Sequence, residues 1–351
     1  MIREPTVSVL LPVYNDSKFL EDAINSILHQ SYENFEIVIV SEPSDDGTRS
    51  IIESYDDHRV RGIHNESRIG LNRSLNKGLD ACRGQFVARM DADDLAAERR
   101  LSKQVQFLSS HPDIGIVGSF CDKINDNGNI CGIYRVPKSD TAIRWCALTK
   151  NPFAHPAVMM RTSVLDEHDL RYQESKQQFA VEDYDLWIRA LQYTKGWNIP
   201  EPLVKFRSTN DGVSARHKRR QRRNGDQVAY RAITNELPDF EISEQETHNL
   251  RRFLFGSLDP EIDPTAVLKI YFKLYNCFEN KYAGGPGIQE AQQIACLSAS
   301  EASVKSKNVR TFAHAVNNCL KLRKSFPIDF LSYTSALLKY RYGSRIRNQL
   351  I

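Results

Sequence analysis

Short apolar runs alternate with amphipathic segments through the first part of the chain. Four runs have the length of a strand: residues 7–14, 35–40, 60–65 and 85–90, of which 35–40 is rich in β-branched residues. Residues 17–28 repeat apolar residues at helical spacing, residues 48–55 can start another helix, and residues 70–82 predict a third despite Gly78. Asp16 or Ser17 is placed to cap the first of these helices. Strands that alternate with helices predict an α/β fold with a mostly parallel sheet.

Polar clusters follow three of these strands directly, at residues 12–15, 41–48 and 91–94. Right-handed crossovers place the carboxyl ends of parallel strands at one edge of the sheet, where ligands usually bind. We therefore expect the three clusters to converge on that edge.

The middle of the chain continues with mixed elements. Residues 99–111 form an amphipathic pattern, and 114–124 with 130–137 predict a hairpin around the turn at 126–129. Residues 181–194 predict a helix with acidic residues in its first turn, where the helix dipole favours them.

After Gly225 the pattern becomes purely helical, with breaks at Pro238, Pro260, Gly284 and Pro327. The predicted helices are 226–237, 243–256, 264–280, 288–304, 308–325 and 327–341. We therefore expect two domains, an α/β domain over residues 1–222 and an all-α domain over 223–351.

Composition limits the class of protein. The chain has 351 residues, 41% hydrophobic and 26% charged, which is ordinary for a globular protein. No apolar run approaches the ~18–20 residues of a membrane-spanning helix, and the N-terminus lacks the basic-then-apolar pattern of a secretory signal. Seven scattered Cys without a C-x-x-C pair disfavour a disulfide framework or a zinc site. These features favour a cytoplasmic protein.

The net charge of +3 conceals an asymmetry. Residues 1–210 hold 25 Lys and Arg against 30 Asp and Glu, and residues 211–351 hold 22 against 14. The basic run 216–223 leaves three interpretations open: a solvated segment, a loop that closes over a diphosphate, or a peripheral contact with anionic lipid at the membrane. No aromatic interleaving accompanies the run, so nucleic acid is not an expected partner.

Three carboxylates occur within four residues after the strand at 85–90: Asp91, Asp93 and Asp94. Their mutual repulsion calls for a cation, and hard oxygen ligands favour Mg²⁺ or Mn²⁺. Such an ion normally shares its coordination sites with substrate phosphates. The plainer interpretation is a solvated acidic turn, which is common for an isolated D-x-D.

Two further motifs offer chemistry. Glu182 and Asp183 begin the predicted helix 181–194, either as ordinary first-turn acids or as a carboxylate base for an incoming hydroxyl. His155 precedes Pro156, which predicts a rigid extended loop rather than a helix. A lone His of this kind is more often a structural hydrogen-bonding group than a ligand.

The order of these motifs resembles family 2 glycosyltransferases of the GT-A fold, over roughly residues 6–215. The matching segments are VSVLLPVYN, D-D-G-T, G-L-x-x-x-L-N-x-G-L, ARMDADD, RLSKQVQFL, IGIVGS, NPFAHPAVM and EDYDLWIR. The resemblance implies a Rossmann-like, mostly parallel sheet, a nucleotide-diphosphate sugar donor and a divalent metal ion. Bacterial enzymes of this kind that build surface glycans one sugar at a time are the nearest type, because no Q-x-x-R-W follows Asp183.

The resemblance also assigns roles to residues. The nucleotide-sugar site would comprise Pro12, Val13, Tyr14, Glu42, Arg68, Asp91, Ala92 and Asp93. Asp91 would lie near the ribose, Asp93 with Asp91 would hold the metal, and Asp183 would be the general base. Acceptor contact or support would fall to Asp94, His155, Glu182 and Trp187. Arg89 and Arg100 match family positions that either form ion pairs or contact substrate.

The implied reaction is transfer of one sugar, most often from a UDP-sugar, to a hydroxyl of a glycan or lipid-linked acceptor. A metal ion stabilises the departing diphosphate, and a carboxylate on the opposite face of the sugar deprotonates the acceptor. One-step attack from that face inverts the anomeric centre.

Two departures from the family pattern keep alternatives open. Glu42 replaces the usual Asp that contacts the base, and Arg207–Ser208–Thr209 lacks the family His that can bind the metal, for which His217 is a speculative substitute. The missing His admits a nucleotide-sugar-binding protein without transferase activity. A nucleotidyltransferase is the other alternative, although it needs a Gly-rich basic loop where PVYNDS stands.

Overall fold

The computed structural model describes residues 4–175, 180–208 and 218–322, and the chain divides into two compact units. The first, the sheet unit, contains residues 1–143 and 151–228, and the second, the helical unit, contains 144–150 and 229–351. The division thus lies beyond the expected boundary at 222, and a short internal segment joins the helical unit.

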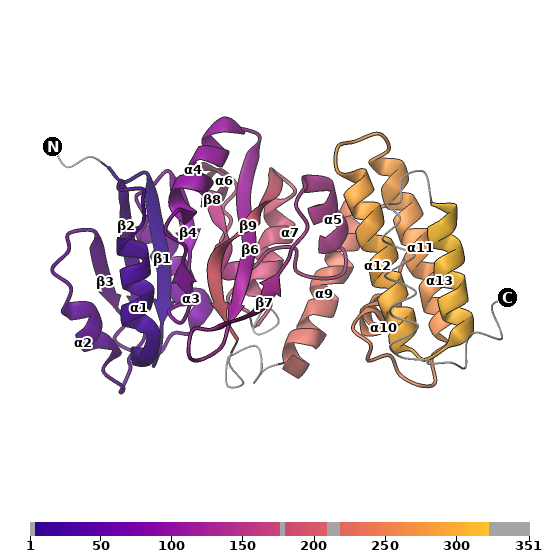
Figure 1. Ribbon diagram of the computed structural model, residues 1–351, viewed down its shortest axis with the longest axis horizontal. Coiled ribbons are helices and arrows are strands. Elements are labelled where there is room, and N and C mark those ends of the chain that lie inside the picture. The colour runs from indigo at the N-terminus through magenta and orange to yellow at the C-terminus, as the bar shows by residue number, and fades with distance from the viewer. Residues whose placement is uncertain (1–3, 176–179, 209–217, 323–351) are drawn as a thin grey trace. The chain divides into compact units, whose positions relative to one another are not determined.

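Four parallel strands form one side of the sheet in the order β3-β2-β1-β4, with β3 at its edge (Figure 1). They are β1 (Val7–Val13), β2 (Phe35–Ser41), β3 (Val60–His64) and β4 (Phe86–Arg89). All four match the strands predicted from the apolar runs, and the α/β fold with a mostly parallel sheet is confirmed. Their carboxyl ends therefore share one edge, which we call the carboxyl edge.

The sheet continues beyond β4 in the order β8-β6-β9-β5, with β7 paired to β6. These strands are β5 (Leu95–Ala96), β6 (Ile114–Ile124), β7 (Ile130–Tyr134), β8 (Met159–Arg161) and β9 (Lys195–Arg207). The hairpin of β6 and β7 is confirmed. The short strands β5 and β8 were not predicted, because two or three residues show no periodicity and are extended only through pairing with β9, β4 and β6.

Helices cover both faces of the sheet. They are α1 (Ser17–Leu28), α2 (Thr48–Glu53), α3 (Leu71–Ala81), α4 (Arg100–Ser110), α6 (Thr162–Glu167) and α7 (Glu182–Ala190). Val9 and Leu11 of β1 pack with α1, while Leu10 faces α3. A Cβ at Gly78 would lie 2.2 Å from Leu10 Cδ1, so glycine permits the close approach of α3 to the sheet.

The expected capping of α1 by Asp16 or Ser17 is wrong. The Asp16 side chain makes no hydrogen bond to the first turn, and the Ser17 backbone N–H donates instead to Asp46 Oδ2 at 2.8 Å. The capping carboxylate therefore comes from the loop after β2, which sequence spacing alone does not reveal.

The helical unit is built from α10 (Glu244–Leu254), α11 (Pro264–Lys281), α12 (Ile288–Lys305) and α13 (Val309–Lys321), with the end of α9 (Lys218–Glu236). Their bounds agree with the predicted helices, and a capping box at Ser243 starts α10. α5 (Asp140–Ala147), which was not predicted, contributes Trp145 to this unit. The Trp145 ring lies 5.1 Å from that of Tyr275 and 5.4 Å from that of Tyr271. This aromatic cluster explains why 144–150 belong to the helical unit.

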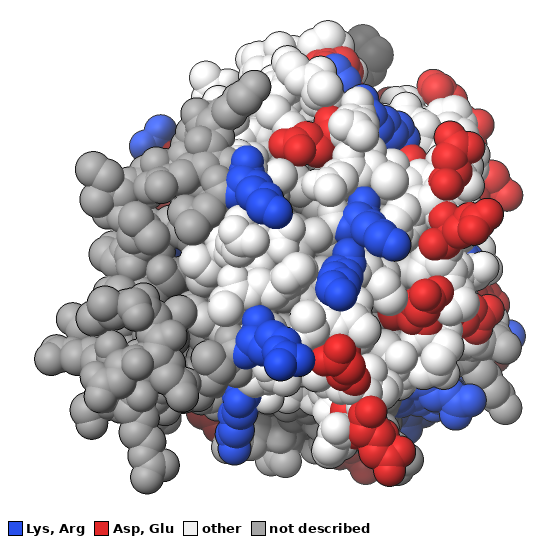
Figure 2. Space-filling view, turned by 90° about the vertical axis from the view of Figure 1, so that its right-hand side faces the viewer, with Lys and Arg blue, Asp and Glu red and all other residues white. Residues whose placement is uncertain are grey.

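Helix α9 begins at Lys218, well before the predicted start at 226, and includes most of the basic run. Lys and Arg are good helix formers, and one interior Gly costs only about 1 kcal/mol, so Gly225 does not interrupt the helix. Figure 2 shows one face of the helical unit, with Lys and Arg spread among uncharged residues. Within the described ranges, no helix has both the length and the apolar content to span a bilayer. The predicted helix 327–341 lies outside the described residues.

Candidate active site

Hydrogen bonds join the loops that follow β1 and β2 at the carboxyl edge. The Asn15 backbone N–H donates to Ser44 Oγ at 3.1 Å, and Asn15 Nδ2 donates to Asp45 Oδ1 at 2.8 Å. Asn15 has a φ of 48°, a left-handed conformation that Asn tolerates better than most residues. The two loops are therefore held together at this edge of the sheet.

The expected nucleotide residues at the end of β1 differ in exposure. Pro12 is buried, and Val13 is 4% exposed and part of the hydrophobic core. Tyr14 is 40% exposed, and the Arg68 guanidinium lies 3.9 Å from its ring centroid. Tyr14 and Arg68 are thus both exposed to a ligand, and the cation–π contact places them side by side.

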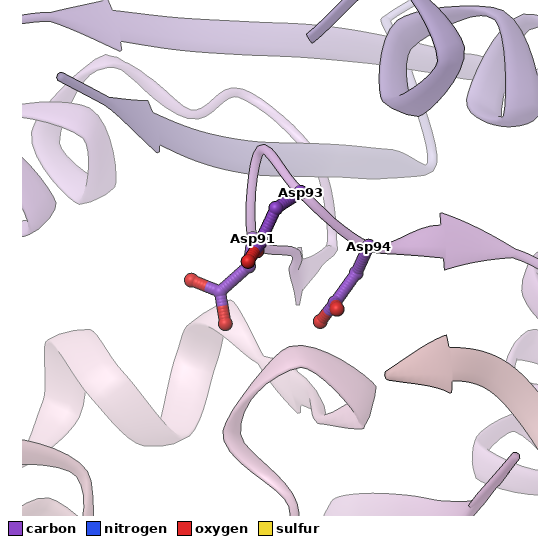
Figure 3. A group of neighbouring side chains, drawn as sticks. All are labelled: Asp91, Asp93 and Asp94. Carbon is purple, nitrogen blue, oxygen red and sulfur yellow. The ribbon is translucent and has the colours of Figure 1, made fainter. Parts of the chain in front are cut away.

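Three carboxylates meet on the turn after β4, which we call the aspartate turn. One oxygen each of Asp91, Asp93 and Asp94 lies within 4.8 Å of the others. The side chains leave a single turn and point to the same side of it (Figure 3). Ala92 between them is 4% exposed and packs into the hydrophobic core. The turn therefore presents its acids to the site and its apolar residue to the core.

Two buried arginines hold the aspartate turn. Arg89 pairs with Asp91 through Nη2, and its Nε and Nη1 have no hydrogen-bond partner among the described residues. The Arg207 backbone N–H donates to Asp94 Oδ1 at 2.7 Å, and its Nε donates to the Asp93 carbonyl at 2.8 Å. The buried Oδ2 of Asp94 finds no partner in the part of the chain that the structure describes. The turn thus carries negative charge that its neighbours leave uncompensated.

The pKa values of these carboxyls are raised, as expected for negative charges that repel one another. Burial, then the charges of Asp91 and Asp16, raises the pKa of Asp93 to about 7. Burial, then Asp91 and Asp46, raises the pKa of Asp16 to about 6. Burial and Asp91 also raise the pKa of Asp94 well above its usual range. A bound cation would relieve these shifts, and an all-oxygen donor set fits Mg²⁺ or Mn²⁺.

Asp183 is fixed at the start of α7 by one hydrogen bond to each oxygen. Asn151 Nδ2 donates to Oδ2 at 2.5 Å, and the Tyr184 backbone N–H donates to Oδ1 at 2.7 Å. Burial raises the pKa of Asp183, although these donors and the nearby Arg89 partly offset the effect. Burial and the adjacent Asp183 raise the pKa of Glu182 to about 7. An oriented carboxylate with a raised pKa suits a proton acceptor.

His155, Trp187 and Arg100 have the contacts of supporting residues. His155 Nε2 lies 3.0 Å from the Tyr172 hydroxyl, and its ring packs against that of Trp187, which is fully buried. Burial, then Arg89, lowers the pKa of His155 well below its usual value, so its ring is neutral. The residue forms part of a short 3₁₀ turn, η1 (His155–Ala157), rather than the extended loop expected. Arg100 donates to the Arg89 carbonyl at 2.6 Å.

Glu42 lies at the end of β2 and is 6% exposed. It accepts hydrogen bonds from the Ile69 and Gly70 N–H groups of the turn before α3, and from the Ser74 hydroxyl in the first turn of α3. The carboxylate that stands at the expected base-contact position is therefore engaged with the protein itself.

Sequence reasoning missed three residues of the site: Asn151, Arg207 and Asp16. Asn151 is the first residue of the NPFAHP motif, in which His155 was the candidate. Arg207 is the first residue of the Arg-Ser-Thr segment, in which Thr209 was considered. Asp16 was taken as a helix cap. Thr209 and His217, discussed for the metal site, lie outside the described residues.

The sheet with an aspartate turn at its carboxyl edge defines a GT-A nucleotide-sugar transferase fold. The chain belongs to Glycosyl transferase family 2, whose sequence profile matches residues 8–168. It is 35% identical over 217 residues to the putative glycosyltransferase EpsE of Bacillus subtilis, covering 60% of this chain and 76% of EpsE. It is 30% identical to the amylovoran biosynthesis glycosyltransferase AmsE of Erwinia amylovora, covering 60% of this chain and 79% of AmsE.

A solved structure supports the fold assignment. The mannosyltransferase PcManGT of Pyrobaculum calidifontis, in complex with GDP-Man and Mn²⁺, superposes with a TM-score of 0.54 at 18% identity. The match covers 92% of this chain and 89% of PcManGT. At this identity the likeness concerns the fold alone.

Proposed function

We propose that this protein is an inverting, metal-dependent glycosyltransferase that moves one sugar from a nucleotide-diphosphate sugar, most often a UDP-sugar, to an acceptor hydroxyl. The observation that carries the proposal is the aspartate turn, whose three carboxylates lie within 4.8 Å of one another with a buried, unpartnered oxygen on Asp94 among the described residues. Such a turn costs stability unless a ligand neutralises it.

Tyr14 and Arg68 would hold the nucleoside, and Asp91 would contact the ribose. Arg68 is exposed, and no hydrogen bond from its guanidinium to another described residue is present, so its donors are open to a ligand. Asp91 is held in place by Arg89, which reduces the conformational freedom lost when a donor binds.

Asp93 and Asp91 would hold Mn²⁺ or Mg²⁺. When bound, the ion would stabilise the negative charge that develops on the departing diphosphate. Arg207 keeps the turn in one geometry through Asp93 and Asp94, so that the carboxylates need not reorganise.

Asp183 would accept the proton of the acceptor hydroxyl. Asn151 and the Tyr184 N–H use one lone pair on each carboxylate oxygen and leave others for the acceptor. A base on the face of the sugar opposite the diphosphate leads to inversion of the anomeric centre.

We further propose that the acceptor is a glycan or lipid-linked intermediate of surface polysaccharide biosynthesis, made at the cytoplasmic side of a membrane. The similarity to AmsE, an amylovoran biosynthesis glycosyltransferase, supports this proposal. The basic residues 216–223 would provide the peripheral membrane contact.

The test is a screen of UDP-, GDP-, dTDP- and CMP-sugars for Mn²⁺-dependent binding and hydrolysis. Asp93→Asn and Asp183→Asn are the test variants, and Asp113→Asn, an exposed residue paired with Lys195, is the matched control. Binding without turnover in any acceptor mixture would favour the binding-protein alternative. If no nucleotide sugar binds in the presence of metal, the proposal is wrong.

A further inference from the structure

The Glu42 carboxylate is committed to the turn that precedes α3. Its Oε2 accepts from the Ile69 backbone N–H at 2.9 Å, and its Oε1 accepts from the Gly70 N–H at 2.9 Å and Ser74 Oγ at 2.5 Å. With 6% of the residue exposed, little of the carboxylate is left for a ligand. Withdrawing it would leave the buried Ser74 hydroxyl and two part-buried backbone N–H groups without this acceptor, which is unfavourable.

The donors around Glu42 are themselves fixed. Ser74 Oγ, while donating to Glu42, accepts from Asn65 Nδ2 at 3.1 Å, and Asn65 Oδ1 accepts from Lys77 Nζ at 2.8 Å. Gly70 has a φ of +90°, so the turn takes a backbone conformation that residues other than glycine rarely adopt. The network therefore specifies a single conformation of the turn.

This turn carries Arg68, directly before Ile69. The Arg68 guanidinium stacks over the Tyr14 ring at 3.9 Å from its centroid, although both side chains are exposed. An exposed cation–π contact is worth only about 0.5–1 kcal/mol, so it does not by itself hold a long side chain in place. The fixed backbone at residues 69–70 restrains the position from which the Arg68 side chain extends.

We propose that Glu42 is a positioning residue that sets the Tyr14–Arg68 stack, and that it does not accept a hydrogen bond from the nucleotide base. The inference rests on the proposed function, in which Tyr14 and Arg68 hold the nucleoside. The base is then selected by stacking and by the Arg68 donors, which favour a base that presents a carbonyl oxygen, such as uracil or guanine.

Modified nucleotides test the proposal on the unaltered protein. The probe is UDP against 3-methyl-UDP, which lacks the base N–H that a carboxylate would bind, with 5-methyl-UDP as a control for the added methyl group. If the protein prefers GDP, the pair is GDP and 1-methyl-GDP. We expect affinity for the N-methylated probe to fall by no more than about threefold by calorimetry, whereas the loss of a charged hydrogen bond would cost about tenfold to a hundredfold.

A double-mutant cycle tests the route through Arg68. Glu42→Gln and Arg68→Ala should each weaken UDP binding about tenfold, and the double variant should be little weaker than either, because one acts through the other. Ser74→Ala should give a smaller loss of the same kind. Glu53→Gln, an exposed carboxylate paired with Arg49 on α2, is the matched control and should bind UDP normally.

The outcomes separate the two proposals. If the unaltered protein binds no nucleoside diphosphate, the proposed function fails. If it binds UDP, but N-methylation abolishes binding or the two substitutions add to about a hundredfold loss, Glu42 contacts the base and only this inference is overturned. Amide exchange at Ile69 and Gly70 should rise in Glu42→Gln, a change that a pure base contact would not cause.

Discussion

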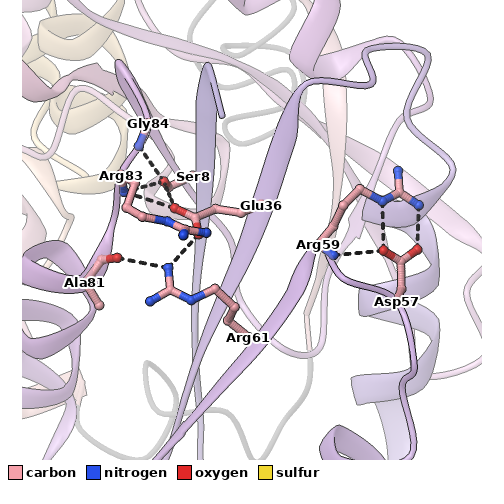
Figure 4. Close-up of polar contacts among 8 residues, drawn as sticks. All are labelled: Ser8, Glu36, Asp57, Arg59, Arg61, Ala81, Arg83 and Gly84. Atoms are coloured by element: carbon pink, nitrogen blue, oxygen red, sulfur yellow. Dashed lines mark hydrogen bonds and ion pairs between the residues drawn. The ribbon is translucent and has the colours of Figure 1, made fainter. Parts of the chain in front are cut away.

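Buried carboxylates at the two ends of the parallel strands have opposite surroundings. At the amino ends, Glu36 accepts hydrogen bonds from Ser8 Oγ at 2.7 Å, Arg61 Nη1 at 2.6 Å and Arg83 Nη2 at 2.7 Å (Figure 4). Burial raises the pKa of Glu36, but these bonds outweigh it and bring the pKa to about 2. At the carboxyl edge the pKa of Asp93 moves the other way, to about 7.

The two carboxyls differ in pKa because Glu36 has more hydrogen-bond donors around it, and not because one is less buried than the other. Ser8 also accepts from the Gly84 N–H at 2.9 Å, so the Glu36 cluster joins β1, β2, β3 and the turn before β4. Every charge there has a partner within the protein, which makes the cluster a source of stability. The aspartate turn has fewer such partners: Arg89 pairs with Asp91 and Arg207 donates to Asp94, but Asp94 Oδ2 has none among the described residues. The repulsion that remains is the physical reason to assign the turn to a ligand.

Asp183→Asn should produce the largest effect. Because the amide cannot accept the proton, kcat should fall about 10³-fold, while the Kd of the nucleotide sugar stays within about threefold. Steady-state kinetics and calorimetry on the same preparation measure the two quantities. Normal turnover would remove Asp183 from the role of base.

Asp93→Asn should separate function from stability at the carboxyl edge. We expect kcat to fall about 10²-fold, since charge stabilisation at the diphosphate is lost. Without metal the variant should melt at a higher temperature than the unaltered protein, because one repelling charge is gone. Mn²⁺ should raise the melting temperature of the unaltered protein and not that of the variant; a variant that melts lower would contradict the comparison.

Glu36→Gln should do the reverse at the amino ends. Breaking a buried ion pair typically costs about 3 kcal/mol, so the free energy of unfolding should fall by roughly that amount while kcat is unchanged. Urea denaturation measures the change. The exposed pair of Glu53 and Arg49 again provides the control, and Glu53→Gln should leave the unfolding midpoint where it was.

The pH dependence of stability should have opposite signs for Glu36 at the amino ends of the strands and for Asp93 at the carboxyl edge. Glu36 has a lowered pKa, so its contribution is present above about 4.5 and is lost as the pH falls towards about 2. Asp93 has a raised pKa, so in chelator-treated protein stability should decline as the pH rises from about 4 to about 7. Asp93→Asn should make that decline smaller without abolishing it, because Asp16 and Glu182 also have raised pKa values. An unchanged slope would show that the charge of Asp93 is compensated.

Much of the sheet unit was predictable because its signals are local. The runs at β1, β2 and β4, the amphipathic α1 and α4, and the acids directly after β4 are all readable from neighbouring residues. Strand β8 was not, because its three residues are extended only through pairing with β4 and β6. The same limit applies to α5, whose Trp145 packs against rings of α11 that are more than a hundred residues away in the sequence.

The sequence by itself determined which chemical groups stand at the strand ends: a Tyr after β1, a Glu after β2, three Asp after β4 and an acidic pair at the start of α7. Only the tertiary structure decided their partners and charges. Asp94 meets the backbone of Arg207 across 113 positions of the chain, and Asp183 meets Asn151 across 32. Burial and hydrogen bonding set a carboxyl's pKa, and both depend on segments that folding brings together. The sequence therefore determines where the acidic residues stand along the chain. The fold determines that Glu36 stabilises the protein, whereas the aspartate turn retains charge that a ligand can neutralise.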